Sequence, residues 1–190
     1  MNVYDFDNTI YDGDSTIDFY LFCVMKHPKV LFCLPGQIYG FLLYKLKKVE
    51  KTRFKEMFFS FLKKLPNANK EVEEFWSHKQ YKIKEWYLKI QEENDVIISA
   101  SPEFLLREIC NRIGIKNLIA SDVDINSGLF YKENCYGEKK VDFFWQRYPN
   151  AKIDNFYSDS LSDGPLAKLA KKAYIVSKDD VHQWLFKEGK

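Results

Sequence analysis

The chain has few of the side chains that build cysteine and histidine metal sites. It contains four cysteines and three histidines in 190 residues; the cysteines form no CxxC pair and the histidines are scattered. This composition excludes the usual thiolate and imidazole sites for zinc. We expect the cysteines to be reduced thiols in the core of a cytoplasmic protein.

Long apolar segments are also missing. The longest one, Val30 to Tyr44, is interrupted by Pro35-Gly36-Gln37 and by Gly40, and it falls short of the roughly 18 residues that a spanning helix needs. The first residues read directly as a strand, so no signal peptide is predicted. No motif indicates nucleic-acid binding, and no feature indicates an oligomeric state.

Charge is distributed unevenly, although the net charge is only +2. Residues 26–65 hold ten Lys or Arg and two Glu, a net charge of +8, so the rest of the chain carries −6. Such a segment can be a solvated helix face, or it can attract anionic substrates or anionic lipid. The overall composition, with 46% hydrophobic and 17% aromatic residues, is that of a globular domain with a core rich in rings.

Short β-branched runs alternate with amphipathic helical stretches. Strands are predicted at residues 1–10, 94–101, 117–125, 152–159 and 172–177. Helices are expected over 103–113 and 140–148, and Asn126-Ser127-Gly128 reads as the turn of a hairpin. The alternation predicts an α/β fold with a Rossmann-like, mostly parallel sheet.

A long segment between the first two predicted strands has helical periodicity and no convincing strand. Apolar residues recur at helical spacing from Phe54 to Leu65 and from Val72 to Ile90. A parallel crossover needs only a dozen or so residues, so we expect residues 15–92 to form an inserted all-helical cap. The catalytic core is then 1–14 plus 93–190.

Acidic, hydroxyl and lysine side chains follow the predicted strands. They are Asp5, Asp7 and Thr9 in one motif, Ser99 and Ser101 in a second, Lys139 and Lys140 in a third, and Asp159 and Asp163 in a fourth. The exits of parallel strands meet at one edge of the sheet. Several carboxylates without His or Cys favour Mg²⁺, and a lysine beside helix N-termini suits phosphate. Ser101 also suits a helix N-cap, with Pro102 at the first helical position.

These four motifs, in this order, resemble those of the haloacid dehalogenase superfamily of phosphohydrolases. Ile98-Ser99-Ala100-Ser101, Gly137-Glu138-Lys139-Lys140 and Ser158-Asp159-Ser160-Leu161-Ser162-Asp163 are similar to the phosphoserine-phosphatase-like branch, whose helical cap (C1 type) is inserted between the first two motifs. The resemblance covers essentially the whole chain. It implies a Mg²⁺-dependent phosphatase that forms an aspartyl-phosphate.

The resemblance also implies a role for each motif residue. Asp5 is the nucleophile, and Asp7 is the general acid and then the general base. Thr9, Ser99 and Lys140 belong to the phosphate site, with Ser101 as an alternative to Ser99 and with the family spacing favouring Lys140 over Lys139. Asp5, Asp7 (through its carbonyl) and Asp159 bind Mg²⁺, and Asp163 supports the metal directly or through water.

Substrate selection is assigned to the helical segment. Asp14 stands where phosphoserine phosphatases have an acidic residue for the substrate amine, although it could equally be a solvated turn residue, and Arg53 is the nearest candidate for the substrate carboxylate. We therefore expect a small phosphorylated metabolite, phosphoserine-like, as substrate. The alternatives are a lipid phosphate, reached by peripheral membrane contact through the basic cap, or a non-catalytic domain that binds an anion or a partner.

Overall fold

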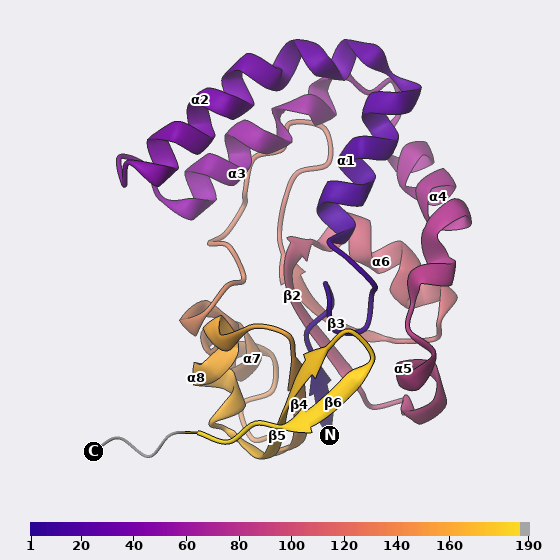
Figure 1. Ribbon diagram of the computed structural model, residues 1–190, viewed down its shortest axis with the longest axis vertical. Helices are drawn as coiled ribbons and strands as arrows, with labels where there is room; N and C mark the ends of the chain where they lie inside the picture. Colours follow the sequence, from indigo (N-terminus) through magenta and orange to yellow (C-terminus); the bar gives the residue numbers. More distant parts are fainter. Residues whose placement is uncertain (187–190) are drawn as a thin grey trace.

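The strands of the protein form one six-stranded sheet, seen in the computed structural model, which describes residues 1–186 (Figure 1). The strands are β1 (Asn2–Tyr4), β2 (Val96–Pro102), β3 (Asn117–Ser121), β4 (Ile153–Ser158), β5 (Ala170–Ser177) and β6 (Asp180–Gln183). Their order is β3-β2-β1-β4-β5-β6, parallel throughout except for β6. The predicted α/β class and mostly parallel sheet are confirmed.

Two details of the sheet differ from the prediction. The first strand pairs only as far as Tyr4, because the backbone N–H groups of Thr9, Ile10 and Tyr11 all bind the carbonyl of Phe6 and wind the chain into a turn. The antiparallel edge strand β6 was not predicted. All of its residues are exposed, so it carries no alternating apolar pattern for a sequence analysis to detect.

Helices cover both faces of the sheet because alternate strand residues point to opposite sides. Tyr4, Ile97 and Leu118 join one buried cluster, in which α6 (Glu103–Arg112) supplies Leu105 and Ile109. Their neighbours Val3, Ile98 and Ile119 join the other, which is closed by α7 (Glu138–Arg147) and α8 (Gly164–Ala167). The central strands β1 and β2 are therefore buried on both faces, in keeping with their nearly continuous apolar sequences.

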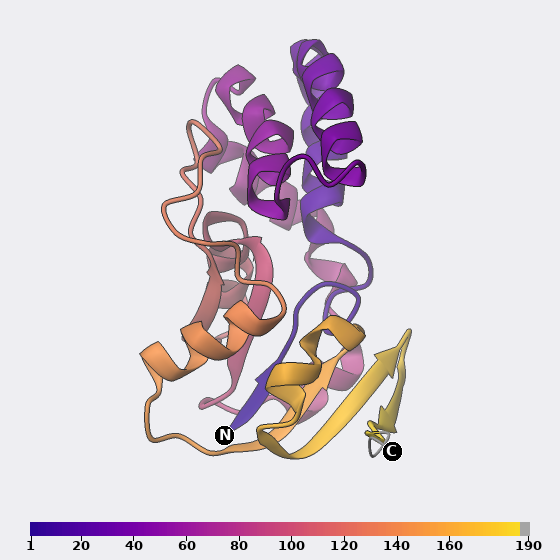
Figure 2. The same ribbon diagram turned by 90° about the vertical axis from the view of Figure 1, so that its left-hand side faces the viewer.

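The segment between β1 and β2 is helical, as predicted. It contains α1 (Ser15–Lys26), α2 (Leu34–Lys45), α3 (Lys51–Phe59), α4 (Ala68–Lys79) and α5 (Glu85–Ile90), with 3₁₀ turns η1 (Pro28–Cys33), η2 (Ser60–Lys64) and η3 (Gln80–Lys82). We call residues 15–90 the helical insert. Figures 1 and 2 show α1, α2 and α3 above the sheet, whereas α4 and α5 lie beside it.

Helix α4 of the helical insert packs against α6 and the sheet. Trp76 of α4 is fully buried, and its indole Nε1 donates to the carbonyl of Leu105 at 2.7 Å. One buried cluster runs from Tyr4 of β1 through Trp76 to Phe61 of the insert. The division of the chain at residues 14 and 92 therefore stays a prediction of domain organisation, and the hydrophobic core is continuous across it.

The segment predicted as a hairpin forms a short hairpin within a long loop. After β3, residues 122–136, here called the connecting loop, rise to α3 (Figure 2). Val123 forms an antiparallel bridge with Phe130, and the backbone N–H groups of Asp124 and Tyr131 donate to the carbonyls of Leu129 and Asp122. Gly128 has a φ of 75°, and a Cβ there would lie 2.5 Å from the carbonyl oxygen of Phe59. The turn residues therefore close a short hairpin, as predicted, and also bring the backbone of the connecting loop against α3.

Two further predictions concern the cysteines and the apolar stretch. The four cysteines form no disulfide within residues 1–186; Cys23, Cys110 and Cys135 are buried and Cys33 is half-buried. In the same part of the chain, no helix combines the length and the apolar character needed to cross a bilayer.

Candidate active site

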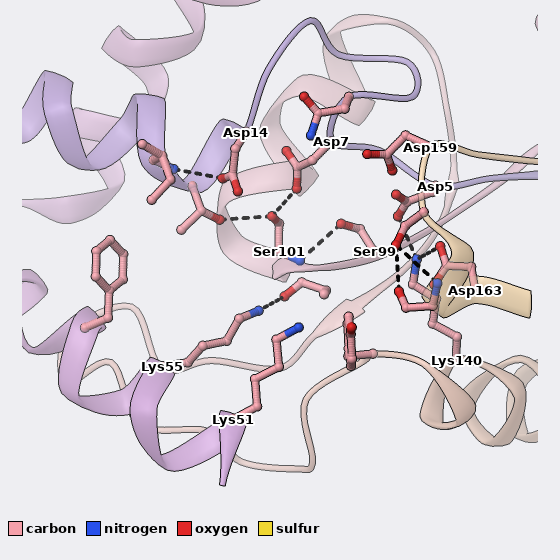
Figure 3. A pocket seen from close by; sticks show the side chains of 18 of the residues that line it. Asp5, Asp7, Asp14, Lys51, Lys55, Ser99, Ser101, Lys140, Asp159 and Asp163 are labelled. Atoms are coloured by element: carbon pink, nitrogen blue, oxygen red, sulfur yellow. Dashed lines mark hydrogen bonds and ion pairs between the residues drawn. The ribbon is translucent and has the colours of Figure 1, made fainter. Parts of the chain in front are cut away.

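The acidic motif residues meet where the sheet changes direction. The chain moves outward from β1 to β2 and β3, then crosses back to place β4 on the other side of β1. Asp5 directly follows β1 and Asp159 directly follows β4, so they emerge at this switch point, where open α/β sheets bind ligands. Figure 3 shows the two carboxylates side by side at one end of a cavity.

Lys140 joins Asp5 to Asp163. It lies in the first turn of α7, its side chain is 2% exposed, and its ammonium Nζ donates to Asp5 Oδ1 and to Asp163 Oδ2, each at 2.7 Å. Burial alone would lower the pKa of Lys140, but the two carboxylates outweigh burial and raise that pKa. The lysine is therefore charged throughout the physiological pH range. Its neighbour Lys139 points outward and pairs with Glu133 and Asp142.

Asp163 is held in place from two sides. Its Oδ2 accepts from Lys140 and also from the hydroxyl of Ser158 at 2.8 Å, and the residue is buried. The sequence analysis assigned Asp163 to the metal. The structure places one of its oxygens on Lys140 and Ser158, which makes it the residue that fixes the lysine against Asp5.

Asp7 lies across the cavity from Lys140 and has its own hydrogen bonds. Its Oδ1 accepts from the backbone N–H of Ser15 at 2.7 Å, and its Oδ2 accepts from the hydroxyl of Ser101. Burial raises the pKa of Asp7 to about 6; the charge of Asp14 adds to the rise and the hydrogen bonds oppose it. A carboxyl group with a pKa near 6 can both release and accept a proton close to neutral pH.

The two serines after β2 have different partners. Ser99 is buried on the cavity wall, and its Oγ accepts from the backbone N–H of Ser101 at 3.1 Å. Ser101 does not cap a helix, contrary to the prediction, because β2 continues to Pro102 and α6 begins at Glu103. Its hydroxyl lies 2.9 Å from the hydroxyl of Thr16 and donates to Asp7 instead.

Thr9 lies behind the acidic residues. It is fully buried, and its hydroxyl accepts from the backbone N–H of Asp159 at 2.9 Å. It is not among the residues that line the cavity. The predicted phosphate contact of Thr9 is therefore not present in this geometry; the hydroxyl fixes the loop after β4 to the loop after β1.

A cavity of about 320 Å³ connects these residues to the helical insert. Its floor carries Asp5, Asp7, Ser99, Lys140 and Asp159, and its roof carries side chains of α1 and α3 (Figure 3). Ile17, Phe54 and Phe58 make part of this roof apolar. The size is that of a site for a small ligand.

The helical insert contributes two cations that the sequence analysis missed. Lys51 and Lys55 of α3 both line the cavity, whereas the predicted Arg53 does not: its side chain is 62% exposed and pairs with Glu56 at 2.9 Å. Residues four apart share a helix face, and a residue midway between them points to the opposite side. The i, i+4 spacing of Lys51 and Lys55 was the available signal.

These two lysines are held by neighbours from the sheet domain. Lys55 Nζ donates to the carbonyl of Ala100 at 2.7 Å and to Asn134 Oδ1 of the connecting loop at 3.0 Å. Lys51 Nζ lies 3.0 Å from the centre of the Tyr136 ring. Burial lowers the pKa of Lys55 to about 8, with the charge of Lys51 acting in the same direction.

Asp14 lines the cavity but has a structural contact as well. Its Oδ1 accepts from the backbone N–H of Ile17 at 3.0 Å, which makes it the N-cap of α1. The Asp14 side chain therefore both caps α1 and forms part of the cavity wall. Its contact with a substrate amine stays a prediction.

Comparison with known families agrees with this geometry. A model of the haloacid dehalogenase-like hydrolase family matches residues 3–168, which contain all four motifs. The chain belongs to this family. A comparison with curated proteins gives no match.

Several solved structures have a similar fold. A protein of unknown function from Bordetella pertussis Tohama I aligns with 91% of this chain over 87% of its own length, with 17% identity and a TM-score of 0.72. A phosphoserine phosphohydrolase-like protein from Francisella tularensis subsp. tularensis SCHU S4 is matched over 91% and 86% of the two chains, at 15% identity and a TM-score of 0.56. A probable phosphoserine phosphatase from Vibrio cholerae, unliganded, shares 10% identity over 90% of this chain and 55% of that one, with a TM-score of 0.55. At these identities the likeness establishes the fold alone.

The acidic end of this haloacid dehalogenase-like hydrolase has the donors that Mg²⁺ requires. Burial raises the pKa of Asp5 to about 7 despite Lys140, and burial together with the charge of Asp163 raises the pKa of Asp159. The single positive charge of Lys140 therefore does not balance the negative charges of Asp5, Asp159 and Asp163. Within residues 1–186, no group of three or more acidic, histidine or cysteine side chains is arranged to hold a metal ion. Mg²⁺ is commonly held by only one or two carboxylates plus water, and Asp5 with Asp159 fits that pattern.

Proposed function

We propose that the protein is a Mg²⁺-dependent phosphatase that hydrolyses a phosphomonoester through an aspartyl-phosphate on Asp5. The observation that carries the proposal is the fixed carboxylate of Asp5 at the switch point, held by Lys140 and open to a cavity that also contains Asp7. Family membership supports hydrolysis, and the paired acids at one strand exit support transfer to a carboxylate followed by attack of water.

The two acids divide the chemistry. Asp5 attacks phosphorus, the bond to the leaving oxygen breaks, and the leaving oxygen takes the proton of Asp7. Water then attacks the aspartyl-phosphate, transfers a proton to Asp7, and releases inorganic phosphate with Asp5 restored. The pKa of Asp7 near 6 suits both proton transfers.

Cationic and hydroxyl groups hold the transferring phosphoryl group. The Lys140 ammonium is already in contact with Asp5, and the Ser99 hydroxyl lies on the same wall, so both are positioned to stabilise charge on the phosphate oxygens. Mg²⁺ bound by Asp5 and Asp159, when present, lets an anionic carboxylate approach an anionic phosphate.

The test is turnover of an aryl phosphate by the Asp5→Asn variant. We expect a loss on the order of 10⁴-fold or more, since removing a nucleophile removes the covalent route. Asp12→Asn is the matched control: it lies in the loop after Asp7, is exposed, and does not line the cavity. Equal activity of Asp5→Asn and Asp12→Asn would refute the aspartyl-phosphate.

A small phosphorylated metabolite that carries a second anionic group fits the cavity best. Lys51 and Lys55 on the roof face the acidic floor, so a substrate with phosphate at one end and an anion at the other meets cations at both. Two of the similar structures are of a phosphoserine phosphohydrolase-like protein and a probable phosphoserine phosphatase. We therefore propose a phosphoserine-like substrate, and a panel of phosphorylated metabolites tests it.

A lipid phosphate is the second candidate substrate. The apolar roof residues Ile17, Phe54 and Phe58 can contact an acyl chain or isoprenoid close to the phosphate. Turnover of a phosphorylated lipid in vesicles that exceeds turnover of every soluble phosphomonoester would favour it. The third candidate, a non-catalytic domain that binds an anion or partner, requires that the purified protein neither turns over aryl phosphates nor binds beryllofluoride at Asp5.

A further inference from the structure

Helix α2 is oriented with one polar residue, Gln37, inward and a stripe of apolar residues outward. Its buried residues are Gln37 and Gly40. The exposed stripe has the spacing of one helix face, i, i+4, i+7 and i+8. It is made of Leu34, Ile38, Phe41 and Leu42, each between 41% and 52% exposed.

Specific contacts fix this orientation. The amide of Gln37 accepts from the hydroxyl of Tyr20 at 2.8 Å and donates to the carbonyl of Phe58 at 2.9 Å. Gly40 lies against Met57, where a Cβ would come within 2.9 Å of the Met57 sulfur. Turning α2 to bury its apolar stripe would break both hydrogen bonds and this close approach.

The apolar surface continues at both ends of α2. Phe32 of η1 is 81% exposed and Leu46 is 65% exposed. We call Phe32, Leu34, Ile38, Phe41, Leu42 and Leu46 the apolar face. Its members lie on consecutive elements at the outer side of the insert, where α2 is an outermost helix (Figure 1). A solvent-exposed set of this kind marks an interaction surface.

Lysines flank the apolar face, and acidic residues do not. Lys29 precedes it and Lys45, Lys47 and Lys48 follow it, all exposed, while residues 28–49 contain no Asp or Glu. Two copies of the chain that met through this face would bring like charges together, which disfavours self-association. An apolar centre with a cationic border instead matches the surface of an anionic bilayer.

The length of α2 decides how it can meet a bilayer. A helix of 12 residues is about 18 Å long, well below the roughly 30 Å of a hydrocarbon core. Its apolar side can therefore enter the interface only with the helix axis parallel to the membrane plane.

We propose that η1 and α2 form a membrane-docking face that binds the surface of anionic bilayers, with the apolar face in the acyl boundary and the flanking lysines at the head groups. Helix α3 packs on α2 through Met57 and lines the cavity through Lys51 and Phe54. Docking would bring the cavity to within one helix of the lipid surface. The proposal does not depend on phosphatase activity.

The test is co-sedimentation of the full chain with phosphatidylcholine vesicles, with and without phosphatidylglycerol. We expect binding to the anionic vesicles at low salt and a marked decrease at high salt. Absence of binding to anionic vesicles at low salt would overturn the proposal, whether or not the enzyme is active.

Two sets of variants separate the apolar and the charged contributions. Ile38→Glu with Leu42→Glu should reduce partition at least roughly tenfold, because both side chains would be withdrawn from the acyl boundary. Lys45→Gln, Lys47→Gln and Lys48→Gln together should reduce it on the order of 100-fold on anionic vesicles, about fivefold per lysine. Vesicle binding that both variants retain would overturn the proposal.

Matched controls guard against trivial explanations. Leu88→Glu on α5 replaces a leucine of similar exposure, 45%, outside the face, and should bind vesicles like the parent. The folded state of each variant is checked by thermal unfolding. A parent protein that is dimeric, becomes monomeric in Ile38→Glu with Leu42→Glu, and ignores vesicles would show that a second copy covers the face, against the proposal.

Discussion

At the scale of single residues, Lys140 determines whether the acidic site can exist. Transferring an ammonium group from water to a buried position costs several kcal/mol unless close partners compensate, and Lys140 has two carboxylate partners at 2.7 Å. Removing it would leave Asp5 and Asp163 buried without a cation. Lys140 therefore stabilises the two buried carboxylates even when no substrate is bound.

Lys55 makes a prediction about pH. Its pKa of about 8 lies below the usual 10.5 because burial and Lys51 disfavour the charged form, while Asp7 and Asp14 across the cavity oppose the shift. The ammonium is thus charged below pH 8 and neutral above it. We expect kcat/KM for an anionic phosphomonoester to fall as the pH rises through about 8.

Substitutions at Lys55 check the origin of this fall. Lys55→Arg keeps a positive charge at all accessible pH values, so its profile should lack the additional fall near pH 8 and keep only the fall caused by Asp7. Lys55→Met should lower kcat/KM at pH 7 by roughly tenfold or more, the value of a charge-assisted hydrogen bond. A fall in Lys55→Arg that matches the parent would assign the titration to another group.

Residue types and spacing predicted the acidic floor of the cavity but not its roof. Three of the floor residues, Asp5, Asp7 and Asp159, follow strands, and Lys140 lies in the first turn of a helix. The carboxyl ends of parallel strands all lie at the same edge of the sheet, so the sequence order was enough to bring these residues together. Arg53 was chosen for its charge, but the face that a helical residue presents depends on how α3 packs, and that packing is set by distant contacts such as Ala100 with Lys55.

At the scale of elements, the pair α2 and α3 depends on one glycine. A Cβ at Gly40 would lie 2.9 Å from Sδ and 3.0 Å from Cβ of Met57, whereas a Cβ at Gly36 has no atom within 4 Å. Gly40→Ala should destabilise the protein by about 1–3 kcal/mol, because the helices must move apart. Gly36→Ala should stabilise it by up to about 1 kcal/mol through helix propensity.

The free energies of unfolding of these two variants, measured in urea, are the readout. Both substitutions add the same methyl group to the same helix, so their difference reports the contact with Met57 alone. Equal effects would mean that α2 and α3 do not approach as closely as Gly40 indicates.

Elements with a strong periodic pattern were predicted, and those without one were not. Strands β2 and β3 contain apolar runs, β4 and β5 contain shorter ones, and α7 begins only two residues before its predicted start. The edge strand β6 is wholly exposed. The turn residues of the connecting loop close the predicted hairpin over only one bridge, and the contacts of the loop with Phe59 and Glu56 could not be read from the sequence.

At the scale of the whole molecule, Mg²⁺ should stabilise the fold. A ligand that binds only the folded state at about 100 times its Kd contributes about 2.7 kcal/mol, which for a chain of this length is a rise in Tm of about 5–10 °C. EDTA should reverse the rise and abolish turnover. Asp5 and Asp159 are distant in the sequence but follow the neighbouring strands β1 and β4, so the ion would join these two strands.

The matched variants for this measurement are Asp159→Asn and Asp12→Asn. The first should lose the rise in Tm, since it removes one of the two carboxylates that fit the ion, and the second should keep it. A rise of the same size in both would place the bound ion elsewhere.

The position of β1 sets the order in which a newly made chain can complete its site. This strand is the first to leave the ribosome, yet it lies between β2 and β4, and Asp5 is 135 residues from its partner Lys140. At about 5–20 residues per second, translation of the 135 residues between them takes roughly 7–27 s. Throughout this time Asp5 has no native counter-ion, so the site can close only after Lys140, Asp159 and Asp163 have been made.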